Sequence, residues 1–344
     1  MLRATLLSAL GCSIALVTTS AAHAATLRVP QQYPTIQAAV DAAAPGDRIR
    51  VGRGRYCGAT LTKNVFLDGR GRPRIIGCDT SPTITTGLRV GFYLPGVKGS
   101  NPASGSKIRG FVFDGEGVSS ANLLPLSFGV FARFASDVVV QGNTFDGTVQ
   151  AITSTAGDRW RIERNRIRHL TVLDCTSYCT GGDGIVISLA RGTLAGPGGD
   201  AAAINRPEDN VIRRNSIEGT APDGFSDFSL AGVLLFSADH TAVLSNELEL
   251  RDNPAADAVG QGILVTNTCC GLGTTFLPGS RFTTLAYNDG RKSEVGIVVE
   301  GSDGANTEGL ALRRNRGTTV VEGAVQLAAA ARRVLAPVRA QPTL

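Results

Sequence analysis

The sequence predicts an all-β protein, a right-handed parallel β-helix with a short helix that caps its N-terminal end. Three observations predict this fold: a motif built around Asn that recurs along the chain, a second motif that begins with Gly and alternates with the first, and an amphipathic segment that precedes the first strand signal. Such repeats are typical of solenoids, in which each unit packs only against its neighbours.

The first motif is an apolar residue, two variable residues, Asn, one variable residue and a second apolar residue. Its copies are Val140–Phe145, Ile162–Ile167, Ile212–Ile217 and Val243–Leu248, with shorter copies at Leu285–Asn288 and Leu312–Asn315, and with Phe in place of Asn in Ile108–Phe113. We expect the copies to form one corner of successive coils, stacked about 4.8 Å apart. Asn suits an inward turn position, because it tolerates the left-handed conformation and its amide forms ladders between coils.

The second motif is a Gly followed by β-branched or apolar residues. Its copies begin at Gly129, Gly184, Gly232, Gly262 and Gly296. Because side chains alternate between the two faces of a strand, aligning the copies predicts one outward surface that is mostly apolar. This surface suits either cover by long loops or the stacking of sugar rings. It contributes Phe131, Phe236, Arg133 and Glu300 as candidate substrate-binding residues.

A short helix is predicted just before the first strands. Ile36, Ala39, Val40 and Ala43 form one apolar stripe at helical spacing, and Thr35 suits the helix start. Pro45 and Gly46 end the helix. Residues 48–51 then alternate with period two, so that Ile49 and Val51 face inward on a strand.

The stretches Thr35–Val40, Pro45–Ile49, Gly54–Tyr56 and Phe66–Gly69 together resemble the opening of the pectin-lyase-like right-handed parallel β-helix superfamily, whose coils are PbH1-type repeats. The resemblance implies the fold, and it implies binding, with or without processing, of an extracellular acidic polysaccharide by a lyase or a hydrolase. The superfamily also includes non-catalytic proteins. The Gly-His-Gly, Asn-Thr-Asp and Arg-Ile-Lys motifs of polygalacturonases do not occur in this sequence, so a non-catalytic surface or periplasmic interaction protein is the alternative.

The N-terminus predicts export. Arg3, an apolar run from Leu6 to Val17 and the small residues Ala22 and Ala24 have the order of a secretory signal peptide, which we assign to residues 1–24. A lipoprotein anchor at Cys12 is the rival interpretation. Residues 25–344 contain no second apolar run long enough to cross a membrane and no linker. We therefore expect a single secreted or periplasmic β-helix domain.

Charge and cysteine content fit that location. The formal net charge of +5 is too small to indicate a nucleic-acid partner, but it suits an anionic polysaccharide or a cell-surface glycan. Cys57 and Cys78 are about one coil apart, which predicts a disulfide between neighbouring coils. The other cysteines of the exported chain are Cys175, Cys179, Cys269 and Cys270. An oxidising compartment favours disulfides among them, either local or between the two pairs, over a four-thiolate metal site.

The candidate catalytic residues are Asp183, Asp227, Asp239 and His240. They lie at the ends of predicted strands or in the loops between them, where carboxylates supply acid and base or bind calcium. The simpler interpretation is that Asp at a turn accepts hydrogen bonds from nearby backbone N–H groups. Calcium binding and enzymatic activity are therefore predicted only under the first of these two interpretations.

The last sequence feature that bears on function is the position of several arginines. Arg164 and Arg214 immediately precede the repeated Asn, and Arg191 lies in the longest predicted loop, which spans residues 169–210. If Arg164 and Arg214 occupy adjacent coils, their charges stack and favour an anionic partner. The alternative is that Glu163 and neighbouring acids neutralise them. We assign all three arginines as candidate substrate-binding residues.

Overall fold

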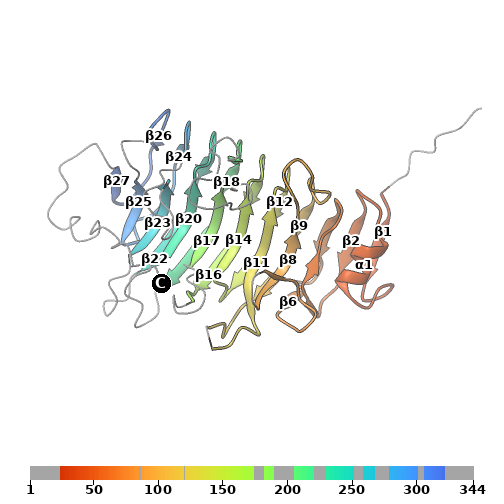
Figure 1. The fold of residues 1–344 in the computed structure, drawn as a ribbon. Helices are drawn as coiled ribbons and strands as arrows, with labels where there is room; N and C mark the ends of the chain where they lie inside the picture. Colours follow the sequence, from red (N-terminus) through yellow and green to blue (C-terminus); the bar gives the residue numbers. More distant parts are fainter. Residues whose placement is uncertain are drawn as a thin grey trace, which may run out of the picture.

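The computed structural model describes residues 24–84, 87–119, 121–173, 182–189, 205–220, 230–251, 259–267, 279–300 and 306–321. These residues form a right-handed parallel β-helix that runs from the N-terminal end, red in Figure 1, to the blue C-terminal end. The predicted fold class is confirmed. Each full coil contributes one strand to each of three parallel sheets, which we name sheets A, B and C.

The strands follow the order A, B, C in each coil. Sheet A contains β1 (Thr26–Val29), β2 (Arg48–Val51), β5 (Phe66–Gly69), β9 (Lys107–Arg109), β12 (Val139–Gln141), β15 (Arg161–Glu163), β18 (Val211–Arg213), β21 (Ala242–Leu244), β24 (Thr284–Ala286) and β26 (Ala311–Arg313). Sheet B contains β3 (Arg55–Cys57), β6 (Arg74–Ile76), β10 (Val112–Asp114), β13 (Thr144–Asp146), β16 (Arg166–Leu170), β19 (Ser216–Thr220) and β22 (Glu247–Arg251). Sheet C contains β4 (Ala59–Thr60), β8 (Leu88–Leu94), β11 (Leu126–Arg133), β14 (Gln150–Thr155), β17 (Asp183–Ser188), β20 (Leu230–Phe236), β23 (Gly260–Thr266), β25 (Val295–Val299) and β27 (Thr319–Val321), with β7 (Thr83–Ile84) antiparallel to β8.

The repeated Asn forms the corner between sheets A and B. The amide ladder is confirmed: Asn165 Nδ2 donates to Asn215 Oδ1 at 3.0 Å and to the Val140 carbonyl at 2.9 Å. Equivalent bonds join Asn143, Asn165, Asn215, Asn246, Asn288 and Asn315. The predicted left-handed conformation is wrong for Asn itself, because the residue before it adopts a positive φ, 54° at Arg164 and 56° at Arg214. That preceding side chain therefore points outward, while the amide stays buried.

Inside the coils lies one continuous apolar core. Ile108, Val140, Ile162 and their counterparts in sheet A are fully buried and stack along the solenoid. Phe113 and Phe145 continue the column in sheet B, with their rings stacked 4.5 Å apart. Burying aliphatic and aromatic side chains on every coil is the main stabilising contribution to such a solenoid.

The capping helix α1 (Ile36–Ala42) closes the N-terminal end of this core, as predicted (Figure 1). Thr35 is its N-cap and accepts a hydrogen bond from the Ala38 N–H at 3.0 Å. Ile36, Ala39 and Val40 are buried against the first coils. The helix covers apolar side chains that would otherwise be exposed at the end of the stack.

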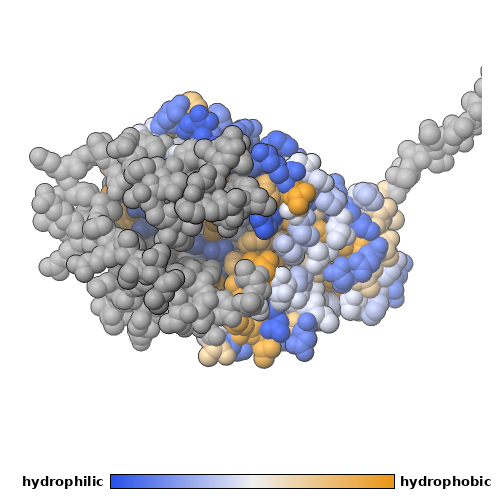
Figure 2. Space-filling model, viewed as in Figure 1, coloured by the Kyte–Doolittle hydropathy of each residue, from blue (hydrophilic) through white to orange (hydrophobic). Residues whose placement is uncertain are grey.

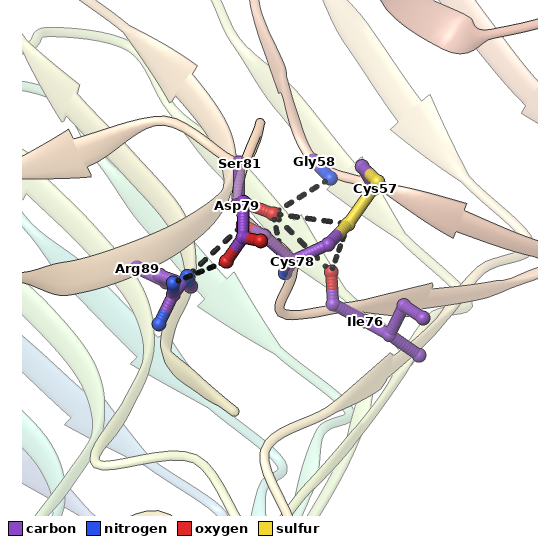
Figure 3. The surroundings of a disulfide bond; sticks show 7 residues. All are labelled: Cys57, Gly58, Ile76, Cys78, Asp79, Ser81 and Arg89. Atoms are coloured by element: carbon purple, nitrogen blue, oxygen red, sulfur yellow. Dashed lines mark hydrogen bonds and ion pairs between the residues drawn. A yellow bond between two sulfur atoms is a disulfide. The ribbon is translucent and has the colours of Figure 1, made fainter. Parts of the chain in front are cut away.

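The predicted disulfide between Cys57 and Cys78 is present, with Cα atoms 5.7 Å apart. Figure 3 shows it beside Ser81, whose Oγ accepts hydrogen bonds from the N–H groups of Gly58 and Cys78. Because Cys57 ends β3 and Cys78 follows β6, the bond ties two adjacent coils together. The four other predicted disulfide cysteines, Cys175, Cys179, Cys269 and Cys270, lie outside the described residues.

From β12 onward, every long connection begins or ends at sheet C. From β12 onward every corner between sheets A and B is a short turn, such as Arg164 and Asn165. The segments outside the described residues, among them 174–181, 190–204 and 268–278, instead connect sheet C with sheet B or sheet A. Sheets A and B therefore present regular outer faces. In the described part of the chain, no helix has both the length and the apolar character that a membrane span requires.

Candidate functional site

The outer surface predicted from the Gly motif is the outer face of sheet C. Register places Phe131, Val186 and Leu234 in one row and Arg133, Ser188 and Phe236 in the next. Phe131 is half-buried against Tyr93 and Phe128. Figure 2 shows apolar residues gathered near β8 and β11, between hydrophilic ones.

The predicted substrate-binding residues of sheet C differ in accessibility. Phe236 is 9% exposed and packs against Leu189, whereas Arg133 is exposed at the end of β11. Glu300 follows β25 and is half-buried. Of the described residues in this set, Arg133 is therefore the one most accessible to a ligand. Arg191 lies outside the described residues.

The candidate acids occupy separate places. Asp183 begins β17 on sheet C, where Gln150 Nε2 donates to its carboxylate at 3.2 Å. Asp239 and His240 instead lie in the turn from sheet C to sheet A. Asp227 lies outside the described residues. In the described ranges, no three His, Cys, Asp or Glu side chains are grouped so as to hold a metal ion, and calcium binding stays a prediction.

Asp239 is an internal ion-pair partner. Its side chain is 1% exposed, and its carboxylate accepts from Arg206 at 2.6 Å and from Arg281 at 2.7 Å. The Arg281 N–H donates to the same carboxylate at 3.0 Å. With both oxygens engaged in the interior, Asp239 ties adjacent turns together through partners 33 and 42 residues away, and not through the local backbone bonds of the simpler interpretation. His240 is exposed, and its ring stacks on Phe282 with centroids 4.9 Å apart.

Arg164 and Arg214 do lie on adjacent coils, because Asn165 and Asn215 are neighbours in the ladder. Both arginines are exposed, and within the described ranges neither forms an ion pair. Glu163 does not neutralise them. Its carboxylate, 6% exposed, instead accepts from Arg161 at 3.1 Å and from Arg213 at 2.9 Å on the outer face of sheet A.

That outer face is strongly basic over the N-terminal two-thirds of sheet A. Buried residues such as Ile49 and Ile108 alternate with outward residues, half of which are cationic. We name the basic face by its outward cations: Arg28, Arg48, Arg50, Lys107, Arg109, Arg161 and Arg213. The acids among them are Asp68 and Glu163. The cations outnumber the acids, and the face carries a net positive charge.

Both acids are held ionised. Burial raises the pKa of Asp68, but hydrogen bonds and charge from Arg109 and Arg70 outweigh it, and the pKa lies below its usual value. The pKa of Glu163 is likewise lowered, because Arg213 and Arg161 outweigh its burial. Each carboxylate pairs with two arginines and neutralises only one of their two positive charges, so the face keeps a net positive charge.

An aromatic ring orders two of these cations. Phe66 lies between Arg48 and Arg109, whose guanidinium carbons are 4.5 Å and 4.7 Å from the ring centroid. The strand β5 lies between β2 and β9, and Phe66 is directly opposite Arg48, whereas Arg109 is opposite Asp68 and reaches the ring diagonally. The ring separates two like charges.

The basic face is the functional candidate that the sequence reasoning missed. The signal was present: Arg48 and Arg50 flank inward Ile49, and Lys107 and Arg109 flank inward Ile108. A period-two pattern of cations on strands of one sheet indicates a charged face. The alternation within one strand locates its inward residues, but which outward residues of different coils are neighbours depends on the pairing of strands far apart in the sequence.

Comparison with known proteins extends to solved structures alone, since no family model and no curated protein sequence matches the chain. Alginate lyase from Paenibacillus sp. str. FPU-7 has 14% identity, with 86% of this chain and 98% of that chain covered and a TM-score of 0.40. The A-module of the mannuronan C-5 epimerase AlgE4 from Azotobacter vinelandii has 16% identity, with 85% and 92% covered and a TM-score of 0.29.

PfbA, a surface adhesin of Streptococcus pneumoniae, has 12% identity, with 82% of this chain and 64% of that chain covered and a TM-score of 0.47. Likeness at these levels concerns the fold and carries no argument about activity. The three parallel sheets of the chain itself are those of a parallel β-helix.

Proposed function

We propose that this is an exported β-helix protein that binds an acidic polysaccharide along the basic face of sheet A. The observation that carries the proposal is the excess of outward cations, which five of the first seven strands of sheet A contribute. Arg28 pairs in register with Arg50, and Asp68 in the next strand pairs with Arg109. Like charges that face each other across a sheet are destabilising unless they are compensated, and a polyanion provides that compensation.

The geometry suits a linear polymer. Arg48, Lys107 and Arg161 lie in one register row on every second strand, so they are about 10 Å apart along the solenoid axis. A polyuronate carries its carboxylates at regular intervals along an extended chain, and arginine binds a carboxylate through two parallel N–H donors. The disulfide between Cys57 and Cys78 supports an oxidising, secreted or periplasmic location.

Binding by the basic face is tested with polygalacturonate in affinity electrophoresis, with neutral dextran as the comparison polymer. The variant replaces Arg28, Arg50 and Lys107 by Gln, and its matched control replaces Arg55, Lys98 and Arg291. We expect the variant to bind about tenfold more weakly, since three exposed charge contacts of at most about 1 kcal/mol each are lost. Added salt should weaken binding by the native chain.

Equal weakening by the control variant, or retention of dextran as strong as that of polygalacturonate, would contradict the proposal. Processing by a lyase or hydrolase reaction stays a prediction. In the same samples, new ultraviolet absorbance of an unsaturated uronate would identify a lyase. New reducing ends without that absorbance would identify a hydrolase. Binding with neither product would favour the alternative, a non-catalytic interaction protein.

A further inference from the structure

A second group of arginines lies around the corner from the basic face, on sheet B. It surrounds a cavity of about 250 Å³ that we name the arginine pocket. Its lining residues are Arg72, Gly142, Asn143, Thr144, Arg164, Arg166 and Arg168. None of them belongs to the basic face as defined above.

The arginines reach the pocket from separate parts of the backbone. Arg166 and Arg168 lie on β16 and pair in register with Thr144 and Asp146 of β13. Arg164 comes from the corner turn before β16, where its positive φ directs the side chain outward. Arg72 comes from the turn before β6 and donates to Thr144 Oγ1 at 2.9 Å. The cations therefore approach one space from several directions.

The pocket has an excess of positive charge and unfilled donors. Arg168 is the one lining arginine with an ion pair in the described ranges, and it binds Asp146 at 2.6 Å. Asp146 also contacts His169 Nδ1 at 2.7 Å. The Arg168 Nε atom is buried and has no hydrogen-bond partner. Within the same ranges, Arg164 and Arg166 have no carboxylate partner.

We propose that the arginine pocket binds a phosphate or sulfate group, either as the free ion or as an ester on a sugar. One guanidinium group satisfies a planar carboxylate, because it donates two parallel N–H hydrogen bonds to the two carboxylate oxygens. Guanidinium groups that converge from two backbone segments, the turn at Arg72 and residues 164–168, instead match a tetrahedral oxyanion, whose oxygens point in several directions. This goes beyond the polyuronate proposed for sheet A, because both the ligand group and the surface differ.

The test is calorimetric titration of the full exported chain at constant ionic strength with inorganic phosphate, inorganic sulfate, glucose 6-phosphate and acetate. The pocket variant is R164Q/R166Q. The matched control is R55Q/R291Q, which also removes two exposed arginines, both outside the pocket lining and outside the residues proposed to bind a ligand. Because all these side chains are exposed, the variants should keep the native unfolding transition.

We expect one site that prefers a tetrahedral oxyanion to acetate by at least about tenfold, and that weakens by about tenfold for each arginine removed. R55Q/R291Q should bind like the native chain. Tighter binding of glucose 6-phosphate than of inorganic phosphate would assign the group to a sugar ester, and the reverse order would assign it to the free ion. Acetate binding as tight as phosphate, or an unaffected pocket variant, would overturn the proposal.

The two proposals fail separately. The Arg28, Arg50 and Lys107 variant should lose polygalacturonate but keep phosphate, and R164Q/R166Q should show the reverse. Loss of both ligands in either variant would show that one shared surface binds both, which would overturn the separate pocket.

Discussion

At the scale of single residues, burial decides the role of each polar side chain. Asn215 is 2% exposed, and its amide bonds to the coils on both sides. Arg214, one position earlier, is exposed because its positive φ turns the side chain outward. A single corner thus combines a structural amide with a cation available for binding.

Replacing Asn215 by Ala should lower the free energy of unfolding by about 3 kcal/mol, because the Asn165 N–H and the Ile162 carbonyl lose buried partners. The control is Asn315→Ala at the end of the ladder, where the side chain is half-buried and the loss should be smaller. Urea unfolding followed by circular dichroism measures both. Equal losses of unfolding free energy in the two variants would mean that the Asn side chain stabilises its own turn and not the neighbouring coils.

The acids of the basic face predict how stability depends on pH. The pKa values of Asp68 and Glu163 are lowered in the folded chain. Their contribution is therefore complete above the unfolded pKa and is lost as the pH falls through the folded pKa, that is, below about pH 4. Denaturant unfolding at a series of pH values checks this. Asp68→Asn should flatten the acid limb, and an unchanged slope would refute the assignment.

At the scale of the elements, short corners and a cross-link keep neighbouring coils in register. The corner turns between sheets A and B leave little freedom to slip, and the ladder fixes the pairing of β15 with β18. Near the N-terminal end, β3 and β6 are short, and the Cys57–Cys78 bond supplements their pairing. Register in turn fixes which outward side chains are neighbours.

Removing the cross-link with Cys57→Ser and Cys78→Ser should destabilise the chain by about 3 kcal/mol, the value typical of a closed loop of this length. Adding reductant to the native chain should give at least the same shift in a thermal melt, because it also reduces any bond among the other four cysteines. If the double variant unfolds at the native temperature, the pairing of the first coils does not depend on the disulfide.

At the scale of the whole molecule, the three sheets present different outer faces. Sheet A is basic over its N-terminal two-thirds, sheet B carries mixed charge with the arginine pocket, and sheet C is largely apolar. From β12 onward, each long connection between the described strands has one end at sheet C, and none joins sheet A directly to sheet B. The basic face, the arginine pocket and the largely apolar face therefore belong to different sheets, and the sheet A and pocket variants described above test the two binding proposals independently.

The sequence by itself determined the solenoid, the Asn corner, the capping helix and the Cys57–Cys78 bond, because each depends on periodicity or spacing within a short stretch. Only the tertiary structure decided which side chains meet. Asn165 and Asn215 are 50 residues apart and still share a ladder bond, and Arg72 reaches Thr144 across another coil. The physical reason is that loops of unequal length separate position in the sequence from position in the stack, and the contacts depend on the stack.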